Sequence, residues 1–190
     1  MGNICTLAVS EDDYRTIINT LEHGYVHKGI SHRPNHRVAM AAKLEYATGM
    51  RISDIVKMRQ KDIVRDGNRY RLDLTEQKTG KKRTFRISNA VYDAIDEYCA
   101  KHKITSDKPI IGTSTYAIQK QLKYVSEYLG IERFNTHSLR KSSAYRVYQL
   151  TNRDIVATQM YLNHSSPMVT SRYLSSCGAV LDDALEMIAM

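Results

Sequence analysis

Apolar residues recur every three or four positions near the start of the chain, which is the period of a helix with one buried face. The run follows Ser10, and Asp13 three positions later completes a pattern that resembles a capping box. We therefore predict a helix that begins near residue 11 and ends by Gly24. The next segment, residues 26–35, is polar and rich in turn-forming residues, so we expect an irregular connection there.

A second helical pattern occupies the residues before Gly49. Pro34 suits the first turn of this helix, because its fixed backbone angle and missing N–H are tolerated there. The apolar side chains that would share one helix face are Met40, Leu44 and Ala47. Gly49 ends the pattern, and a shorter third helix is predicted after it, with Ile52, Ile55 and Val56 turned inward.

The period changes from helical to alternating between residues 62 and 88. Turn-forming residues at 66–68 and 79–80 divide this segment into three strands. Helical spacing resumes with Asn89 and Ser114 as expected caps, begins again at Thr136, and continues to Met190. We therefore predict a mainly α fold of the α+β class, with one small three-stranded antiparallel sheet.

Length and composition limit the class of protein. A chain of 190 residues with 42% apolar residues can bury one sizeable core, so we expect one domain. Neither a membrane span nor a signal peptide is apparent, which favours a cytoplasmic protein. Three widely spaced cysteines argue against a disulfide framework and a four-thiolate zinc site. The net charge of +8 favours a partner rich in phosphate.

Four segments hold residue types that could stabilise a phosphoryl-transfer transition state, and the first two contribute an arginine and a lysine. Arg51 opens a predicted helix, with Asp54 one turn later to hold its guanidinium. Lys78 lies on a basic hairpin tip, from which a lysine can deliver a proton to a leaving oxygen. Taken alone, an Arg–Asp pair at this spacing is usually a surface salt bridge, and a basic tip is usually a solvated edge.

The other two segments lie in the C-terminal third. His137 and Arg140 share one face of a predicted helix and can converge on a single phosphate. His164 is followed nine positions later by Tyr173. With 13 tyrosines in the chain, any single one is more often a packing residue than a nucleophile, so Tyr173 gains its meaning from the whole set.

The order Arg, Lys, His-x-x-Arg, His, Tyr, with these spacings, resembles the active-site motif of the tyrosine recombinase or phage integrase family. The resemblance runs from about Leu7 to Leu174. It implies a tyrosine recombinase catalytic domain over residues 1–174, which cuts and rejoins DNA without metal, nucleotide or other cofactor. The chain departs from the family pattern at Asn163, where glycine is common, and at Arg86, where proline is common.

The resemblance also implies which residues bind the scissile phosphate. Arg51 and Arg140 would clamp it and neutralise the extra charge of the pentacoordinate transition state. His164 would be a further phosphate donor. Asp54 would support the clamp from behind.

Proton transfer is implied for three further positions. Tyr173 would attack the phosphate, displace a 5′ hydroxyl and leave a 3′ phosphotyrosine, with His137 as the proton acceptor or orienting group. Lys78 would be the general acid. Lys81 and Lys82 lie in the same turn and are the alternatives for the general acid, and the Lys-Thr-Gly sequence favours Lys78.

Partners follow from the same resemblance. Double-stranded DNA is expected as the substrate, and the basic residues expected to contact it outside the catalytic set are Lys81, Lys82, Arg83, Lys141 and Arg172. Residues 175–190 are predicted to form a tail helix that docks on a neighbouring protomer, giving a homotetramer on DNA and a monomer when free. Folding of this helix onto its own core is the alternative. No core-binding or arm-binding domain is expected within the chain.

Two other functions fit parts of the pattern. A type IB topoisomerase uses a similar residue set to relax supercoils, but histidine at His137 favours a recombinase. A DNA-binding module that has lost catalysis is the second alternative, and the complete residue set argues against it. A recombinase that integrates or excises a mobile element is therefore the favoured interpretation.

Overall fold

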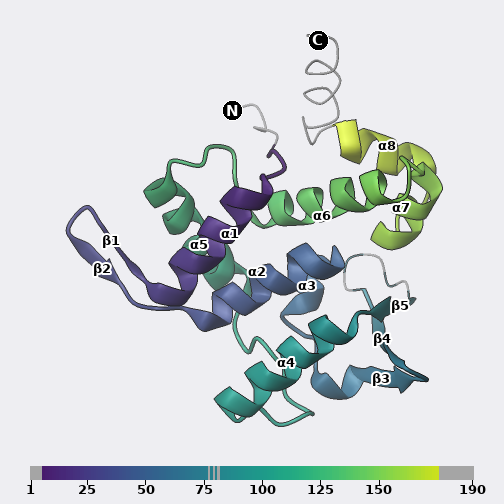
Figure 1. Ribbon diagram of the computed structural model, residues 1–190, viewed down its shortest axis with the longest axis horizontal. Coiled ribbons are helices and arrows are strands. Elements are labelled where there is room, and N and C mark those ends of the chain that lie inside the picture. The colour runs from purple at the N-terminus through teal and green to yellow at the C-terminus, as the bar shows by residue number, and fades with distance from the viewer. Residues whose placement is uncertain (1–5, 77, 79, 81, 176–190) are drawn as a thin grey trace.

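A computed structural model describes residues 6–76, 78, 80 and 82–175 (Figure 1). The elements in chain order are α1 (Glu11–His23), β1 (Tyr25–His27), β2 (Ile30–His32), α2 (His36–Thr48), α3 (Ile52–Ile55), the 3₁₀ turn η1 (Gln60–Asp62), β3 (Ile63–Asp66), β4 (Arg69–Thr75), β5 (Lys82–Ile87), α4 (Asn89–His102), α5 (Thr115–Leu129), α6 (Thr136–Leu150), α7 (Ile155–Leu162) and α8 (Pro167–Ser175). The fold is mainly helical with small antiparallel sheets, so the predicted class is confirmed. None of the described helices combines the length and apolarity that a bilayer crossing requires.

Helix boundaries follow the capping residues. The Ser10 hydroxyl accepts a hydrogen bond from Asp13 N (3.0 Å) at the start of α1, as the sequence pattern predicts. Asn35 caps α2 instead of Pro34 opening it, and Ser88 caps α4 instead of Asn89. Both shifts have one cause: the residue just before the helix has extended or irregular backbone, which leaves its side-chain oxygen free to reach the first N–H groups.

The connection between α1 and α2 is a second small sheet and not irregular chain. Strands β1 and β2 pair antiparallel around a two-residue turn at Lys28 and Gly29, both with positive φ (50° and 76°). Such turns match the twist of a hairpin. The Tyr25 ring stacks on His32 of the facing strand (4.4 Å) and on Tyr128 of α5 (4.6 Å). These contacts stabilise a hairpin that composition alone does not reveal.

The predicted three-stranded sheet is present over residues 63–87, in the order β3-β4-β5 with all pairs antiparallel. The register pairs Thr75 with Lys82 at the end nearest the β4–β5 connection. Figure 1 shows this sheet at the lower right, close to the ends of α2 and α7. At this end of the sheet, the side chain of Arg83 donates hydrogen bonds to backbone carbonyls of Thr48 in α2 and Tyr161 in α7.

Helix α2 is central to the core. Eight of its residues are buried, and α1, α5 and α6 pack against it. A smaller apolar cluster, formed by Ala144, Leu162 and Leu174, joins α6, α7 and α8. Helix α6 packs against α2 and also contacts α7 and α8, so the end of α2 lies near the C-terminal helices (Figure 1).

Candidate active site

The turn between α2 and α3 places Arg51. Gly49 ends α2 in the left-handed conformation (φ 57°), and a Cβ atom there would lie 2.5 Å from Cε1 of Tyr161. Glycine is thus required both by the backbone angle and by the closeness of the tyrosine ring. Arg51 follows at the start of α3 with a side chain that is 18% exposed, and its Nη1 donates to Oε2 of Glu76 (2.6 Å).

Arg140 is the most enclosed cation of the predicted set, with 2% of the residue exposed. Its Nη1 donates to the carbonyl of Gly49, and its Nη2 donates to the carbonyl of Leu162 (3.0 Å). Both acceptors lie at helix C-termini, where carbonyl groups favour a nearby cation. The guanidinium is therefore fixed between the α2 and α7 ends.

His164 lies beside this guanidinium. Its Nε2 is 3.5 Å from Nη2 of Arg140, and its Nδ1 is 3.0 Å from Oγ1 of Thr170. A guanidinium only donates, so Nε2 is the acceptor and the ring proton is on Nδ1, donated to Thr170. Burial, followed by repulsion from Arg140 and Arg51, lowers the pKa of His164 to about 4, so the ring is neutral at pH 7.

Asn163 occupies a position where the family motif commonly has glycine, and the turn after α7 is still formed. It ends α7 in the left-handed conformation (φ 55°), where glycine is easiest and asparagine is among the best-tolerated alternatives. The substitution therefore leaves His164 in place beside Arg140.

Tyr173 lies on α8 and is partly buried. Its ring meets the His164 ring edge-on, with 5.4 Å between centroids, and Nζ of Lys141 is 5.8 Å from its centroid. Its phenol is close enough to Arg140 to contribute to the pKa of that guanidinium. Arg140 of α6, His164 of the α7–α8 connection and Tyr173 of α8 thus come together.

His137 and Lys78 lie at the more open side of the site. His137 is in the first turn of α6, and both side chains are exposed. Protein atoms around the His137 ring still remove part of its hydration, and this desolvation, followed by repulsion from Arg140 and from Lys78, lowers the pKa of His137. Lys78 is therefore close enough for its charge to act on His137. Lys81 lies outside the described residues and Lys82 is exposed in β5, so the choice among the three lysines stays a prediction.

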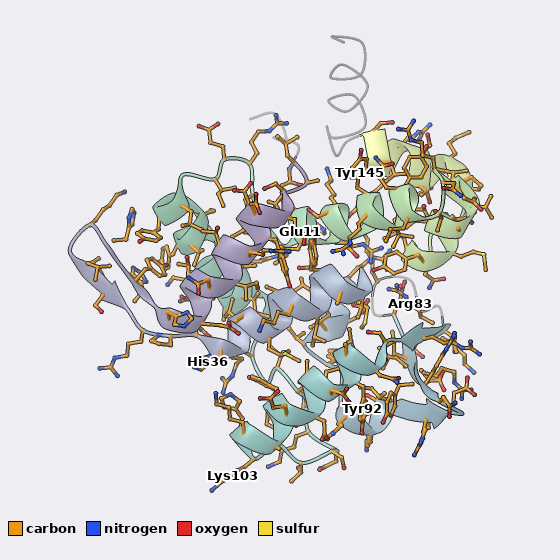
Figure 2. All side chains as sticks on the ribbon, viewed as in Figure 1. Glu11, His36, Arg83, Tyr92, Lys103 and Tyr145 are labelled. Atoms are coloured by element: carbon orange, nitrogen blue, oxygen red, sulfur yellow. The ribbon has the colours of Figure 1, made fainter. Side chains whose placement is uncertain are left out.

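Arg83 and Lys141 differ from the expected DNA contacts. Only 4% of Arg83 is exposed, and its Nη2 donates to the carbonyls of Thr48 (3.3 Å) and Tyr161 (2.5 Å). Lys141 is also buried and donates to the carbonyl of Thr6 (2.6 Å). Both side chains hold protein segments together instead of facing solvent. Figure 2 shows Arg83 where the three-stranded sheet meets the helices of the site.

Two further predicted DNA contacts are exposed in the structure. Arg172 is exposed on α8, and Lys82, predicted to lie in the turn, is exposed at the start of β5, so both are accessible to a large ligand. Asp54 is buried on α3, one turn after Arg51, and it borders a cavity together with Leu74 of β4. Its supporting role stays a prediction.

Two residues at the site, Glu76 and Thr170, were not predicted from the sequence. Glu76 binds Arg51 and also forms an ion pair with Arg83, whose Nη1 is 3.7 Å from Oε1 of Glu76. Thr170 holds the His164 ring. An acidic residue two positions before Lys78, in an otherwise basic turn, was a usable signal for Glu76. Thr170 is fully buried on α8, but it is one of several hydroxyl residues in that segment, so the sequence contains no comparable signal for it.

The gathered groups suit one kind of chemistry. The phenol of Tyr173 lies beside the imidazole of His164 and near the guanidinium of Arg140, and the charges of Arg51 and Arg140 also act on His137. Two buried acidic side chains lie near Arg140: Glu76 is engaged by two arginines, and burial raises the pKa of Glu45 well above its ordinary value. The two guanidiniums can neutralise the charge of a phosphodiester and its transition state. The phenol is the group placed to act as a nucleophile.

Comparisons with known proteins agree with this chemistry. The family model described as "Phage integrase family" matches residues 8–177. The probable integrase/recombinase YoeC of Bacillus subtilis (strain 168) is 37% identical over 135 residues, which cover 67% of this chain and 71% of YoeC.

Two solved structures have the same fold. The post-cleavage complex of the XerH site-specific recombinase with palindromic difH substrate superposes with a TM-score of 0.71 at 16% identity, covering 98% of this chain and 54% of that chain. A lambda integrase tetramer bound to a Holliday junction superposes with a TM-score of 0.68 at 21% identity, covering 94% and 50%. The chain thus spans about half the length of these two recombinases.

The family match covers most of the chain, and Arg140, His164 and Tyr173, three of the residues predicted from the sequence, lie together in the structure. The chain therefore belongs to the phage integrase family of tyrosine-type site-specific recombinases.

Proposed function

We propose that this chain cuts and rejoins DNA at specific sites through a phosphotyrosine at Tyr173, to integrate or excise a mobile element. The observation that carries the proposal is the position of Tyr173, edge-on to His164 at 5.4 Å, with His164 next to the buried guanidinium of Arg140. A phenol next to neutral imidazole and fixed cations is suited to attack a phosphodiester.

In the proposed step the Tyr173 oxygen attacks phosphorus and the bond from phosphorus to the 5′ oxygen breaks. His137 takes the phenol proton, and its lowered pKa keeps the ring unprotonated, and therefore able to accept a proton, near neutral pH. Lys78 gives a proton to the departing 5′ oxygen. Arg51 and Arg140 neutralise the charge on the two nonbridging oxygens.

The 3′ phosphotyrosine retains the energy of the broken phosphodiester, so a 5′ hydroxyl can reverse the step on a new partner strand without nucleotide hydrolysis. Residues 1–174 form the catalytic domain in this proposal. Double-stranded DNA is the substrate, which agrees with the net charge of +8 and with the DNA-bound state of the XerH and lambda integrase structures.

The proposed working assembly is a homotetramer on DNA, as the lambda integrase structure contains, formed from a free monomer. Residues 175–190, apart from Ser175, lie outside the described residues, and the tail helix proposed there would dock on a neighbouring protomer. The proposed location is the cytoplasm of a bacterial or phage-infected cell, in association with the nucleoid.

Covalent trapping tests the proposal. The chain is incubated at low salt, where phosphate contacts are strongest, with a pool of nicked duplexes of randomised sequence that carry a 5′-bridging phosphorothiolate. A protein–DNA adduct on a denaturing gel is expected from the wild type and not from Tyr173→Phe. An adduct that persists in Tyr173→Phe, or its absence from the wild type despite DNA binding, would contradict the proposed nucleophile or the proposed activity.

A further inference from the structure

Glu76 joins two arginines at the junction between the sheet and the helices. Its side chain has no exposed surface. Oε2 accepts a hydrogen bond from Nη1 of Arg51 (2.6 Å), and Oε1 is 3.7 Å from Nη1 of Arg83, whose side chain is 3% exposed. The residue lies just after β4 and two positions before Lys78.

Arg83 anchors this carboxylate to the helical part of the site. Its other terminal nitrogen, Nη2, donates to the carbonyl of Thr48 at the end of α2 and to the carbonyl of Tyr161 near the end of α7. Burial and repulsion from Arg140 lower the pKa of Arg83 to about 10, so the group is still a cation at pH 7. Glu76 is thus held from one side by a guanidinium that is itself fixed to two helices.

Arg51 is the outer end of this chain of contacts. One of its N–H groups is engaged by Glu76, and a guanidinium has five, so the others are left to face a phosphate. A long arginine side chain at the surface would otherwise lose rotamer freedom each time it bound a ligand. An ion pair formed beforehand removes that cost and sets the direction of the remaining N–H groups.

We propose that Glu76 is a positioning residue for cleavage, which holds Arg51 in the orientation that the transition state requires, with Arg83 fixing Glu76 in turn. This inference rests on the proposed function of the site. Glu76 touches no reacting atom in this scheme and acts only through Arg51. A misplaced Arg51 should slow the chemical step while leaving most of the DNA contacts intact.

A buried ion pair can also be purely structural, so the experiment must separate position from stability. Glu76→Gln removes the charge and keeps the size. Glu76→Asp keeps the charge but withdraws the carboxylate by one methylene, so it should fold well and still fail to reach Arg51 fully. The matched control is Asp73→Asn. It is also a carboxylate-to-amide change in the same hairpin, but Asp73 belongs to an exposed ion pair with Arg71 (3.0 Å).

The first readout needs no DNA cleavage. Side-chain ¹⁵N NMR of the arginine groups, with Arg51 assigned by the loss of its signals in Arg51→Lys, reports how freely its guanidinium rotates. Restricted rotation is expected in the wild type and in Asp73→Asn, with freer rotation in both Glu76 variants. Arg51 signals that are unchanged in Glu76→Gln would overturn the inference.

The second readout is single-turnover cleavage of a nicked duplex whose sequence is recovered from the adduct of the randomised pool. We expect Glu76→Gln to cleave on the order of 10- to 100-fold more slowly at saturating protein, with unchanged DNA affinity and Glu76→Asp between the two. Replacing the scissile phosphate with a methylphosphonate removes the charge that Arg51 neutralises. The difference between Glu76→Gln and wild type should then largely disappear.

The outcomes are distinguishable from those of the proposed function. An equal defect of Glu76→Gln on phosphate and methylphosphonate, or a defect confined to thermal stability, would overturn the positioning role. A wild type that forms no adduct, with NMR signals that still depend on Glu76, would refute the proposed activity and leave the positioning of Arg51 standing.

Discussion

Gly49 is the position where a single added methyl group should do the most damage at the site. The residue has φ of 57°, and an added Cβ would lie 2.5 Å from Cε1 and 2.9 Å from Cζ of Tyr161. Its carbonyl also accepts the hydrogen bond from Arg140. Gly49→Ala should therefore strain the backbone, displace the tyrosine ring and disturb the guanidinium together.

The cost has two parts that can be separated. A left-handed backbone with a Cβ costs about 1–2 kcal/mol, and overpacking against the ring adds about 1–3 kcal/mol. Gly49→Ala should thus lower the free energy of unfolding by about 2–5 kcal/mol. Gly130 is the matched control, because its φ is 69° but nothing lies within 4 Å of an added Cβ. Gly130→Ala should lose only the backbone part.

Urea denaturation of the two variants and of Gly49→Ala combined with Tyr161→Leu measures both parts. The double variant should recover part of the overpacking loss, since leucine lacks the ring atoms that meet the new methyl group. The reasoning is refuted if Gly49→Ala is no less stable than Gly130→Ala, or if Tyr161→Leu fails to couple with it. Covalent trapping should also fall with Gly49→Ala and stay near wild type with Gly130→Ala.

Two further predictions concern charge. Since the folded pKa of His164 is about 4 against an ordinary value of 6.5, the unfolded state binds more protons between these values, so stability is complete above pH 6.5 and declines as the pH falls toward 4. Urea titrations across this range should show a shallower decline in His164→Asn, and an identical one would contradict the shift. Arg83→Gln leaves the carboxylate of Glu76 short of one buried partner and should cost about 3–5 kcal/mol in urea unfolding. Arg172 is exposed, so Arg172→Gln should change the free energy of unfolding by no more than about 0.5 kcal/mol. If Arg172 contacts phosphate, the variant should also reduce the salt slope of DNA binding by about one. A larger loss of stability in Arg172→Gln than in Arg83→Gln would contradict the structural role of Arg83 and the surface role of Arg172.

Much of the fold could be predicted because its signals are local. Ser10 caps α1, Gly49 ends α2, and alternating apolar and polar residues predict the three-stranded sheet. The β1–β2 hairpin could not be predicted in this way. Its strands are three residues each, too short for a period to appear, and packing of Tyr25 against Tyr128, about a hundred positions away, stabilises it.

Some of the candidate residues could likewise be assigned from the sequence, and others could not. Arg140, His164 and Tyr173 could be proposed because their order and spacing resemble the motif of a known family, and they do lie together in the structure. Arg83 could not be assigned correctly, since a basic residue in a basic turn is ordinarily solvated, whereas here it is buried against helix carbonyls.

The sequence by itself determined the helices, the sheet and the set of reactive groups, because caps, periodicity and residue chemistry act over a few positions. Only the tertiary structure decided which charges face solvent and which hold the site together. Glu76 and Arg83 are both charged residues of one hairpin, yet they are buried between the sheet and the ends of α2 and α7. The burial of these two side chains depends on contacts between residues up to 78 positions apart. In a low-dielectric interior a charged group is stable only where the fold supplies oppositely charged or hydrogen-bonding partners.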